Sequence, residues 1–194
     1  MNLTQDLRTA ILMTIVTTIL LGVGYPLAIT GLAQVLFRDK ANGQLVERSG
    51  RIVGSRIIGQ TFASTGYFHG RPSAAGTGYD AANSSGTNLG PTNKKLIEAV
   101  AASVEAAKKE NPGAVVPIDL VTSSASGLDP EISPAAALFQ VPRVARERGL
   151  GENDVRQVVA VHSERRQFGF LGEPRVNVLE LNLDLDNRKP MISH

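Results

Sequence analysis

The chain opens with a long apolar segment. Residues 9–37 are 29 positions without a charged side chain, bounded by Arg8 before them and residues 38–40 (Arg-Asp-Lys) after them. A helix rises about 1.5 Å per residue, so roughly 20 apolar residues cross the ~30 Å hydrocarbon layer of a bilayer. The pattern therefore predicts one transmembrane helix near the N-terminus, which holds the polar remainder of the chain at a membrane.

Two other interpretations of this segment remain open. In a cleaved signal peptide, Arg8 would form the charged region, residues 10–21 the apolar region, and Gly31 and Ala33 the small residues before the cleavage point. In a buried core helix, the apolar surface would be covered by the rest of the protein. Signal peptides usually have shorter apolar regions, and core helices are seldom apolar all round at this length, so the membrane anchor is favoured.

Hydrophobic periodicity predicts the elements that follow. Apolar positions three and four residues apart indicate a helix that begins after Asn93 and ends before Pro112, a second helix over residues 133–149 and a third over residues 153–163. Strands are predicted over residues 51–58, 115–121 and 178–186. The last of these has the clearest pattern, because four leucines alternate there with Glu, Asn and Asp.

Two stretches lack any helical or strand period. Residues 69–93 contain five glycines and two prolines, and residues 122–130 are rich in Ser and end in Asp-Pro. Ordinary loops inside compact domains are much shorter than the first stretch, so it is expected to be functional or disordered.

The mixture of helices and strands without regular alternation predicts an α+β fold. We expect an N-terminal segment with the transmembrane helix over residues 1–37, one compact mixed α/β domain over residues 38–186, and a frayed tail over residues 187–194.

Composition excludes several classes of protein. The net charge is only +2, aromatic residues make up 5% and tryptophan is absent, which gives no sign of a nucleic-acid partner. Without cysteine, neither a disulfide framework nor a thiolate metal site can form. The three histidines, His69, His162 and His194, lack the spacing of metal ligands, so no metal site is predicted.

No self-sufficient catalytic motif is present. The chain has no GxxxxGK[ST] phosphate loop, no HExxH and no GxSxG. Ser124, Ser126 and Asp129 permit a nucleophile hypothesis, but no general base is assigned to them, and Ser-Gly-Leu-Asp-Pro is equally a turn before a helix cap. The residues therefore favour an accessory or assembly subunit over an enzyme.

Charged clusters leave further alternatives open. Arg143, Arg146 and Arg148 crowd one predicted helix, where they could bind anionic groups or simply be solvated. The acidic face of the predicted strand over residues 178–186 could gather cations or lie in water. Positive charges after residue 37 weakly favour a cytoplasmic domain, but long domains cross membranes largely regardless of charge, so orientation stays undecided on this ground.

Several sequence blocks in a fixed order carry a resemblance. They include GYPLAITGLAQVLF, VGSRIIGQTF, YFHGRPSA, GTNLGPTN, VPIDLVTSSASGLDPEISPAAA, QVPRVARERG and FLGEPRVNVLELNLDLD. Through these blocks the chain resembles, nearly end to end, the KdpC family of small accessory subunits of bacterial potassium-transporting P-type ATPases. Gln44, Thr87 and Glu131 depart from the residues expected there, which puts a side-chain role at those three positions in doubt.

The resemblance implies partners, cofactors and a location. The partners would be a KdpA-like channel subunit, a KdpB-like ATP-hydrolysing subunit, a very small KdpF-like membrane peptide and the lipid bilayer. No cofactor would be bound tightly, because ATP and K⁺ act through the complex. The chain would cross the bacterial inner membrane once, without cleavage, and carry its domain on the extracytoplasmic side.

The resemblance also implies two roles. One is a catalytic chaperone that supports ATP binding by the pump subunit, with Gln140 linked to nucleotide; the other is a cap at the external potassium entrance. The residues themselves favour a different role for Gln140, which is to organise its own helix. The chain has no phosphate loop, and a domain outside the membrane cannot reach cytoplasmic ATP.

We also expect two functional surfaces, one for docking and one for steering cations. Docking on the channel-like subunit is assigned to residues of the two irregular stretches: His69, Arg71, Pro72, Asn88, Ser126, Asp129 and Pro130. Asp184 and Asp186 are expected to steer cations. A stand-alone membrane-anchored serine hydrolase and a secreted binding domain are the alternatives.

Overall fold

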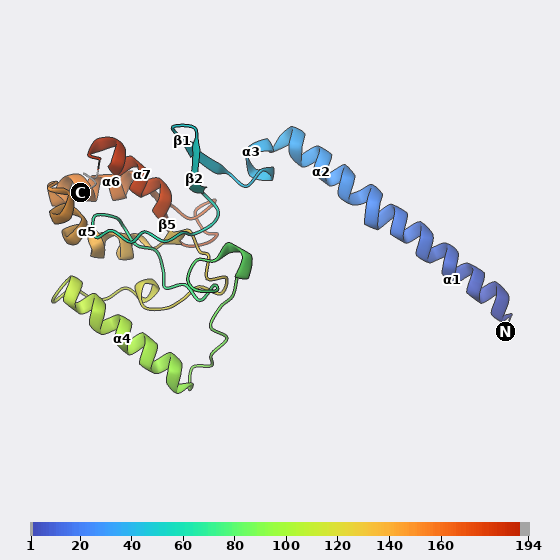
Figure 1. Ribbon diagram of the computed structural model, residues 1–194, viewed down its shortest axis with the longest axis horizontal. Coiled ribbons are helices and arrows are strands. Elements are labelled where there is room, and N and C mark those ends of the chain that lie inside the picture. Colours follow the sequence, from blue (N-terminus) through green and yellow to red (C-terminus); the bar gives the residue numbers. More distant parts are fainter. Residues whose placement is uncertain (1, 191–194) are drawn as a thin grey trace. The chain divides into compact units, whose positions relative to one another are not determined.

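The computed structural model describes residues 2–190 of the chain, which divide into two compact units. Unit 1 is Met1–Leu45 and unit 2 is Val46–His194. The mixture of helices and short strands confirms the predicted α+β class (Figure 1). His194 and the end of the expected tail lie outside the described residues.

Unit 1 is dominated by one long apolar helix. It consists of α1 (Leu3–Thr17), the wider π-helical turns η1 (Thr18–Gly24) and α2 (Tyr25–Leu36). Together they span 34 residues, which include an 18-residue window with a mean hydropathy of 1.9 and no buried side chain. Pro26 has no N–H to donate to the carbonyl four residues earlier, and the wider turns just before it accommodate that missing bond without ending the helix. Length and composition are those of a membrane anchor.

Several polar side chains of this helix find hydrogen-bond partners within unit 1. The hydroxyls of Thr9, Thr14 and Thr17 donate to carbonyls of the preceding helical turn. The amides of Gln34 and Asn42 exchange two hydrogen bonds of 3.2 Å each. Gln34 therefore gives no independent reason to expect a partner helix. After α3 (Arg38–Ala41), a turn at Asn42 and Gly43 leads out of the unit.

Unit 2 contains two small sheets. Strands β1 (Leu45–Arg48) and β2 (Arg51–Ser55) form the first, so the strand predicted over residues 51–58 ends three residues early. Strands β3 (Glu131–Ile132), β5 (Arg175–Asn177) and β4 (Ser163–Glu164) form the second in that order, antiparallel throughout. Val176 pairs with both Ile132 and Ser163.

Four α-helices form the larger regular elements of unit 2. They are α4 (Lys94–Glu110), α5 (Pro134–Arg148), α6 (Glu152–Val161) and α7 (Val178–Arg188). The core lies among α5, α6, α7 and β5, and its fully buried members include Val141, Val144, Val158 and Leu181. In Figure 1, α4 lies apart from these three helices.

The helix boundaries follow from capping residues. The Ser133 side chain accepts a hydrogen bond from the N–H of Ala136 and Pro134 occupies the first turn of α5, while Gly149 ends that helix at a φ of 58°. Asn93 caps α4 in the same way, by accepting from the N–H of Lys95. All three predicted helices are confirmed.

The strand predicted over residues 178–186 is wrong, because this segment is the helix α7. Its buried residues are Val178, Leu179, Leu181, Asn182 and Leu185, which follow the spacing of one helical face. The local start signal is Asn177, whose side chain accepts from the N–H of Glu180. Burial of Asn182 shows that the polar positions do not form one wet strand face.

Two further expectations need correction. Residues 115–121 contain the short 3₁₀ helix η3 (Ile118–Leu120) in place of the predicted strand. Pro117 precedes it and has no N–H to offer a sheet, and Val115 is 92% exposed, so the apolar run packs against no neighbouring strand. The tail expected from residue 187 begins later, since Asn187 and Arg188 still belong to α7.

Candidate functional site

Two buried amide side chains hold an extended segment against the core. Gln140 of α5 accepts a hydrogen bond from the His69 N–H at 2.8 Å and donates to the His69 carbonyl at 3.1 Å. Asn182 of α7 does the same for Phe68, at 2.8 and 2.9 Å. Each amide is only 1% exposed. These side chains replace the backbone partners that a neighbouring strand would otherwise supply.

Two buried arginines complete this clamp. Arg143 donates to the carbonyls of Thr65 and Tyr67 and to Gln140 Oε1. Arg148 donates to the carbonyl of Gly66 at 2.6 Å. We call Gln140, Arg143, Arg148 and Asn182 the side-chain clamp, because together they satisfy consecutive backbone groups of residues 65–69.

Each clamp arginine also has an acidic partner. Arg143 Nε lies 2.8 Å from Glu110 at the end of α4, and Arg148 Nη2 lies 2.9 Å from Asp186. The Tyr67 ring lies beneath Arg148, with 4.8 Å from the guanidinium carbon to the ring centroid, and its hydroxyl donates to Asp186. These arginines are therefore structural, and neither is the anion site or the solvated residue that the sequence suggested. Arg146 alone of the three is exposed.

The two irregular stretches lie against each other beyond the clamp. Arg71 forms an ion pair of 3.2 Å with Asp129 and donates to the carbonyls of Thr122 and Ser123. Ser73 Oγ donates to the Gly127 carbonyl at 2.6 Å. The fold thus brings the predicted docking residues His69, Arg71 and Asp129 into one neighbourhood.

Close backbone approach explains the glycine at the centre of this contact. Gly127 has a φ of 67°, and a Cβ there would lie 2.6 Å from the Ala75 nitrogen and the Ser85 carbonyl oxygen. A substitution at Gly127 would push the two stretches apart. Tyr79 closes the other side by donating from its hydroxyl to the Arg71 carbonyl at 2.6 Å.

Two open grooves flank the Arg71–Asp129 ion pair. One, of about 520 Å³, lies between α4 and the stretch that begins at His69, and it is lined in part by Arg71, Pro72 and Gln140. The other, of about 540 Å³, is lined by both partners of the pair together with Glu131 and Arg175. Four of the seven predicted docking residues therefore border these concave surfaces: His69, Arg71, Pro72 and Asp129.

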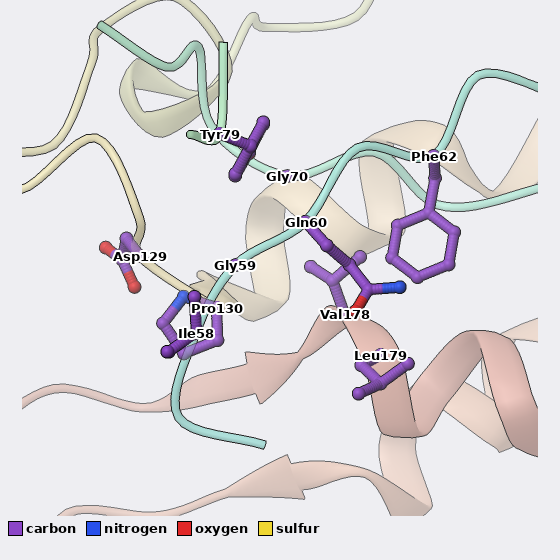
Figure 2. A pocket seen from close by; sticks show the side chains of 10 residues that line it. All are labelled: Ile58, Gly59, Gln60, Phe62, Gly70, Tyr79, Asp129, Pro130, Val178 and Leu179. Atoms are coloured by element: carbon purple, nitrogen blue, oxygen red, sulfur yellow. The ribbon is translucent and has the colours of Figure 1, made fainter. Parts of the chain in front are cut away.

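A third cavity is too small for a ligand. Figure 2 shows it at the place where residues 58–62 pass Asp129, Pro130 and the start of α7. Its volume is about 10 Å³, and a cavity of about 10–15 Å³ holds at most one water molecule. Pro130 and Gly59 both line this cavity, where the two segments pack closely.

Burial shifts the pKa of three groups around the grooves. Burial and the nearby Arg143 charge lower the pKa of His69, so its ring is neutral at pH 7. Burial, with the Asp129 charge adding to it, raises the pKa of the Tyr79 phenol. Burial also raises the pKa of Glu131, against the opposing effect of Arg175. The shifts of His69 and Tyr79 lead away from neutral pH, whereas the shift of Glu131 leads toward it.

Other predicted docking residues lie at the exposed edge. Asn88 is exposed, with a φ of 53°, on the approach to α4. Ser126 is exposed too, and its hydroxyl accepts from the Leu128 N–H at 3.1 Å. His69 Nε2 instead contacts the Ser64 carbonyl, and His162 contacts Asp184. Among the described residues, neither histidine serves Ser124 or Ser126 as a general base.

The predicted cation-steering residues have basic neighbours. Asp184 accepts from Arg188 and contacts His162, and these hydrogen bonds lower the pKa of Asp184 against the opposing effect of its burial. Asp186 pairs with Arg148 and, at 3.5 Å, with Arg48. Since the charge of both carboxylates is compensated locally, their surroundings lend no support to steering. Within residues 2–190, no group of acidic or histidine side chains has the arrangement of a metal site.

The sequence interpretation missed three members of this site. The alternating pattern puts Asn182 on the polar face of a strand, and the charge of Arg143 and Arg148 suggests an anion site or a solvated surface. Their spacing was informative: Gln140, Arg143 and Arg148 lie on α5 at steps that share a face with Val141 and Val144. Long polar side chains on an apolar face indicate backbone groups that need partners.

Comparison with known proteins identifies the family. Residues 7–187 match the family described as K⁺-transporting ATPase, c chain. A potassium-transporting ATPase KdpC subunit of Koribacter versatilis is 64% identical over 187 residues, covering 96% of this chain and 97% of that protein. Subunits of the same name from Acidobacterium capsulatum and Rhodopseudomonas palustris are 58% and 55% identical, covering 94% and 95% of this chain and 98% and 99% of the relatives. The chain therefore belongs to the KdpC family, the non-catalytic C subunits of the potassium-transporting Kdp ATPase.

Proposed function

We propose that this subunit stabilises the Kdp complex by docking its domain, through the surface around Arg71 and Asp129, on a channel-like subunit outside the cytoplasm. In this proposal the partners are that channel-like subunit, the ATP-hydrolysing subunit and a small membrane peptide. By holding the complex together, the subunit supports ATP use and caps the potassium entrance. It does not contact the nucleotide.

Burial of Gln140 is the observation that carries the proposal. The side chain is 1% exposed, and its amide oxygen and nitrogen contact His69, Arg143 and Ala136. A nucleotide could hydrogen-bond to this amide only by displacing the groups that already occupy its oxygen and nitrogen. Gln140 therefore supports ATP binding indirectly, by shaping the surface that begins at His69.

The test of this role is the substitution Gln140→Ala in the assembled complex. We expect a lower yield of complex, while the KM for ATP per assembled complex stays unchanged. His69 would lose two hydrogen bonds in its buried surroundings, each worth about 0.5–1.5 kcal/mol. A raised KM for ATP at unchanged complex yield would contradict the proposal and support direct contact.

Charge swaps test the docking surface itself. Arg71→Asp and Asp129→Arg should each reduce co-purification of the other subunits, but each also breaks the internal ion pair. The double variant restores opposite charges within the domain and still presents the wrong charges to a partner. Continued loss of co-purification in the double variant supports docking, whereas full recovery would assign the pair an internal role only.

A surface pair on α6 provides the matched control. Arg156 and Glu152 form an exposed ion pair one helical turn apart, at 3.1 Å. Reversing both charges there should leave co-purification unchanged, because exposed pairs contribute at most about 1 kcal/mol and this one lies outside the proposed surface.

Orientation in the membrane can be tested with a single cysteine. The chain has no cysteine, and Val115 is 92% exposed, so Val115→Cys introduces one accessible thiol. We expect a membrane-impermeant maleimide to label it from the extracytoplasmic side of intact cells whose outer membrane has been permeabilised. Labelling only after the inner membrane is broken would place the domain in the cytoplasm and would contradict the proposal.

A further inference from the structure

An apolar turn projects from the second sheet of unit 2. Between β4 and β5, Phe168 is 88% exposed, Phe170 70% and Leu171 47%. Of the six phenylalanines in the chain, these two alone are exposed in unit 2: Phe62, Phe68 and Phe139 are at least partly buried, and Phe37 follows the apolar helix. Large apolar side chains gathered at one exposed tip indicate a surface that something apolar covers.

The turn is held in shape without a partner. Gln167 and Leu171 exchange two backbone hydrogen bonds of 2.9 Å, and the Phe170 N–H donates to the Gln167 carbonyl at 3.2 Å. Below the tip, Arg166 binds both carboxylate oxygens of Glu173, at 2.7 and 2.6 Å. The apolar tip is therefore presented on a closed, hydrogen-bonded base.

Phe168 is an unfavourable residue for its backbone position. Its φ is 52°, in the left-handed region that glycine and asparagine adopt more readily. Gly169 next to it also has positive φ. Since an aromatic residue gains nothing from this conformation, its presence points to a role for the exposed ring.

We propose that this turn, residues 166–171, is a second membrane contact, in which Phe168 and Phe170 insert at the boundary between lipid head groups and acyl chains. Aromatic rings favour that boundary. Arg165 beside the turn is exposed and has no ion-pair partner among residues 2–190, so it is available to an anionic lipid phosphate.

The N-terminal helix makes such a weak contact effective. Three apolar side chains alone would bind a membrane poorly, but unit 2 is tethered to the bilayer through the apolar helix of unit 1. The tether turns the second contact into an intramolecular event with a high effective concentration of lipid. The turn would then limit how the domain orients on the membrane surface.

The absence of cysteine allows a direct test on the full chain. Phe168→Cys carries a polarity-sensitive NBD label, and the protein is reconstituted alone in vesicles of phosphatidylcholine and phosphatidylglycerol containing doxyl lipids. We expect a blue shift and stronger quenching by doxyl groups near the head group than by deeper ones, since interfacial segments enter to a depth of about 5–10 Å. The control is Val115→Cys, whose original side chain is equally exposed and lies outside the turn.

A second labelled protein separates the apolar tip from the label itself. With NBD at Leu171→Cys, the change of Phe168 and Phe170 to serine should abolish the quenching, while circular dichroism confirms that the fold is kept. Quenching at position 168 no stronger than at position 115 would overturn the proposal. If the label were shielded only in the assembled complex, the occupant would be a partner subunit, and the proposal of a lipid contact would be equally overturned.

Discussion

Helices α4 and α5 are similar in length but are stabilised in different ways. In α5, nine of 15 residues are buried, whereas in α4 only Ala107 is buried among 17. The α5 helix forms the centre of the core and carries three members of the side-chain clamp. The α4 helix meets the body at its C-terminal end, where Glu110 pairs with Arg143 and Asn111 donates to the Phe139 carbonyl.

The stability of α4 is largely local. Its sequence is rich in alanine, Asn93 caps its start, and the pairs Lys94–Glu98 and Glu105–Lys108 lie one turn apart on its surface. Isolated helices of this length are marginal in water, so α4 should open more readily than α5. The comparison teaches that unit 2 has a densely buried centre and a thinly packed border along the 520 Å³ groove.

The largest effect is expected from the clamp on α5. The Arg148 side chain is 1% exposed, and Arg148→Met removes the nearer of the two arginines that pair with Asp186 and the guanidinium that donates to the Gly66 carbonyl. We expect a loss of about 3 kcal/mol in the free energy of unfolding of the full chain in mild detergent, measured with urea. Arg146→Met, on the exposed side of the same helix, should cost less than about 0.5 kcal/mol. Equal effects would refute a structural role for the buried guanidinium.

Substituting one valine in each helix compares the packing of α5 and α4 directly. Val144 of α5 is fully buried and Val104 of α4 is half-buried. Val144→Ala should lower the free energy of unfolding by about 2 kcal/mol, since it removes buried methyl groups from the core. Val104→Ala should cost less than half as much in the same urea titration. A larger loss at Val104 would mean that α4 packs more tightly than its burial indicates.

Lowering the pH should decrease the free energy of unfolding through the protonation of His69, which contacts α5. Because its folded pKa is lowered, the unfolded chain takes up a proton first as the pH falls through about 6.5, and stability decreases until the folded pKa is passed. Between pH 8 and 5 the free energy of unfolding should therefore fall, with a slope of at most about 1.4 kcal/mol per pH unit. The same titration of His69→Asn should be flatter, and an unchanged slope would assign the effect to another group.

The smallest effect is confined to α4. Ala102 is exposed in the middle of that helix, and Ala102→Gly should weaken it by about 1 kcal/mol. We expect faster amide hydrogen exchange within α4 and unchanged exchange in α5. If α5 exchanged faster as well, the two helices would unfold as one unit and the contrast between them would not hold.

Sequence reasoning succeeded where the determining signals are local. The apolar run, the caps at Asn93 and Ser133 and the stop at Gly149 act through neighbouring residues, and they place the long helix, α4 and α5 correctly. It failed at α7, where alternating leucines indicate a strand and the local start signal, Asn177 with Glu180 three residues later, indicates a helix. The helix prevails because it directs Leu181, Asn182 and Leu185 to one buried face.

The sequence by itself determined the anchor, the α+β class, the absence of cysteine chemistry and, through its blocks, the family. The tertiary structure decided the roles of the polar residues. The side-chain clamp draws its four residues from two helices, α5 and α7, and these residues meet the backbone of residues 65–69 through the packing of those helices in the core. Periodicity reports which side of a helix is buried, but a hydrogen bond between distant segments depends on how those segments pack.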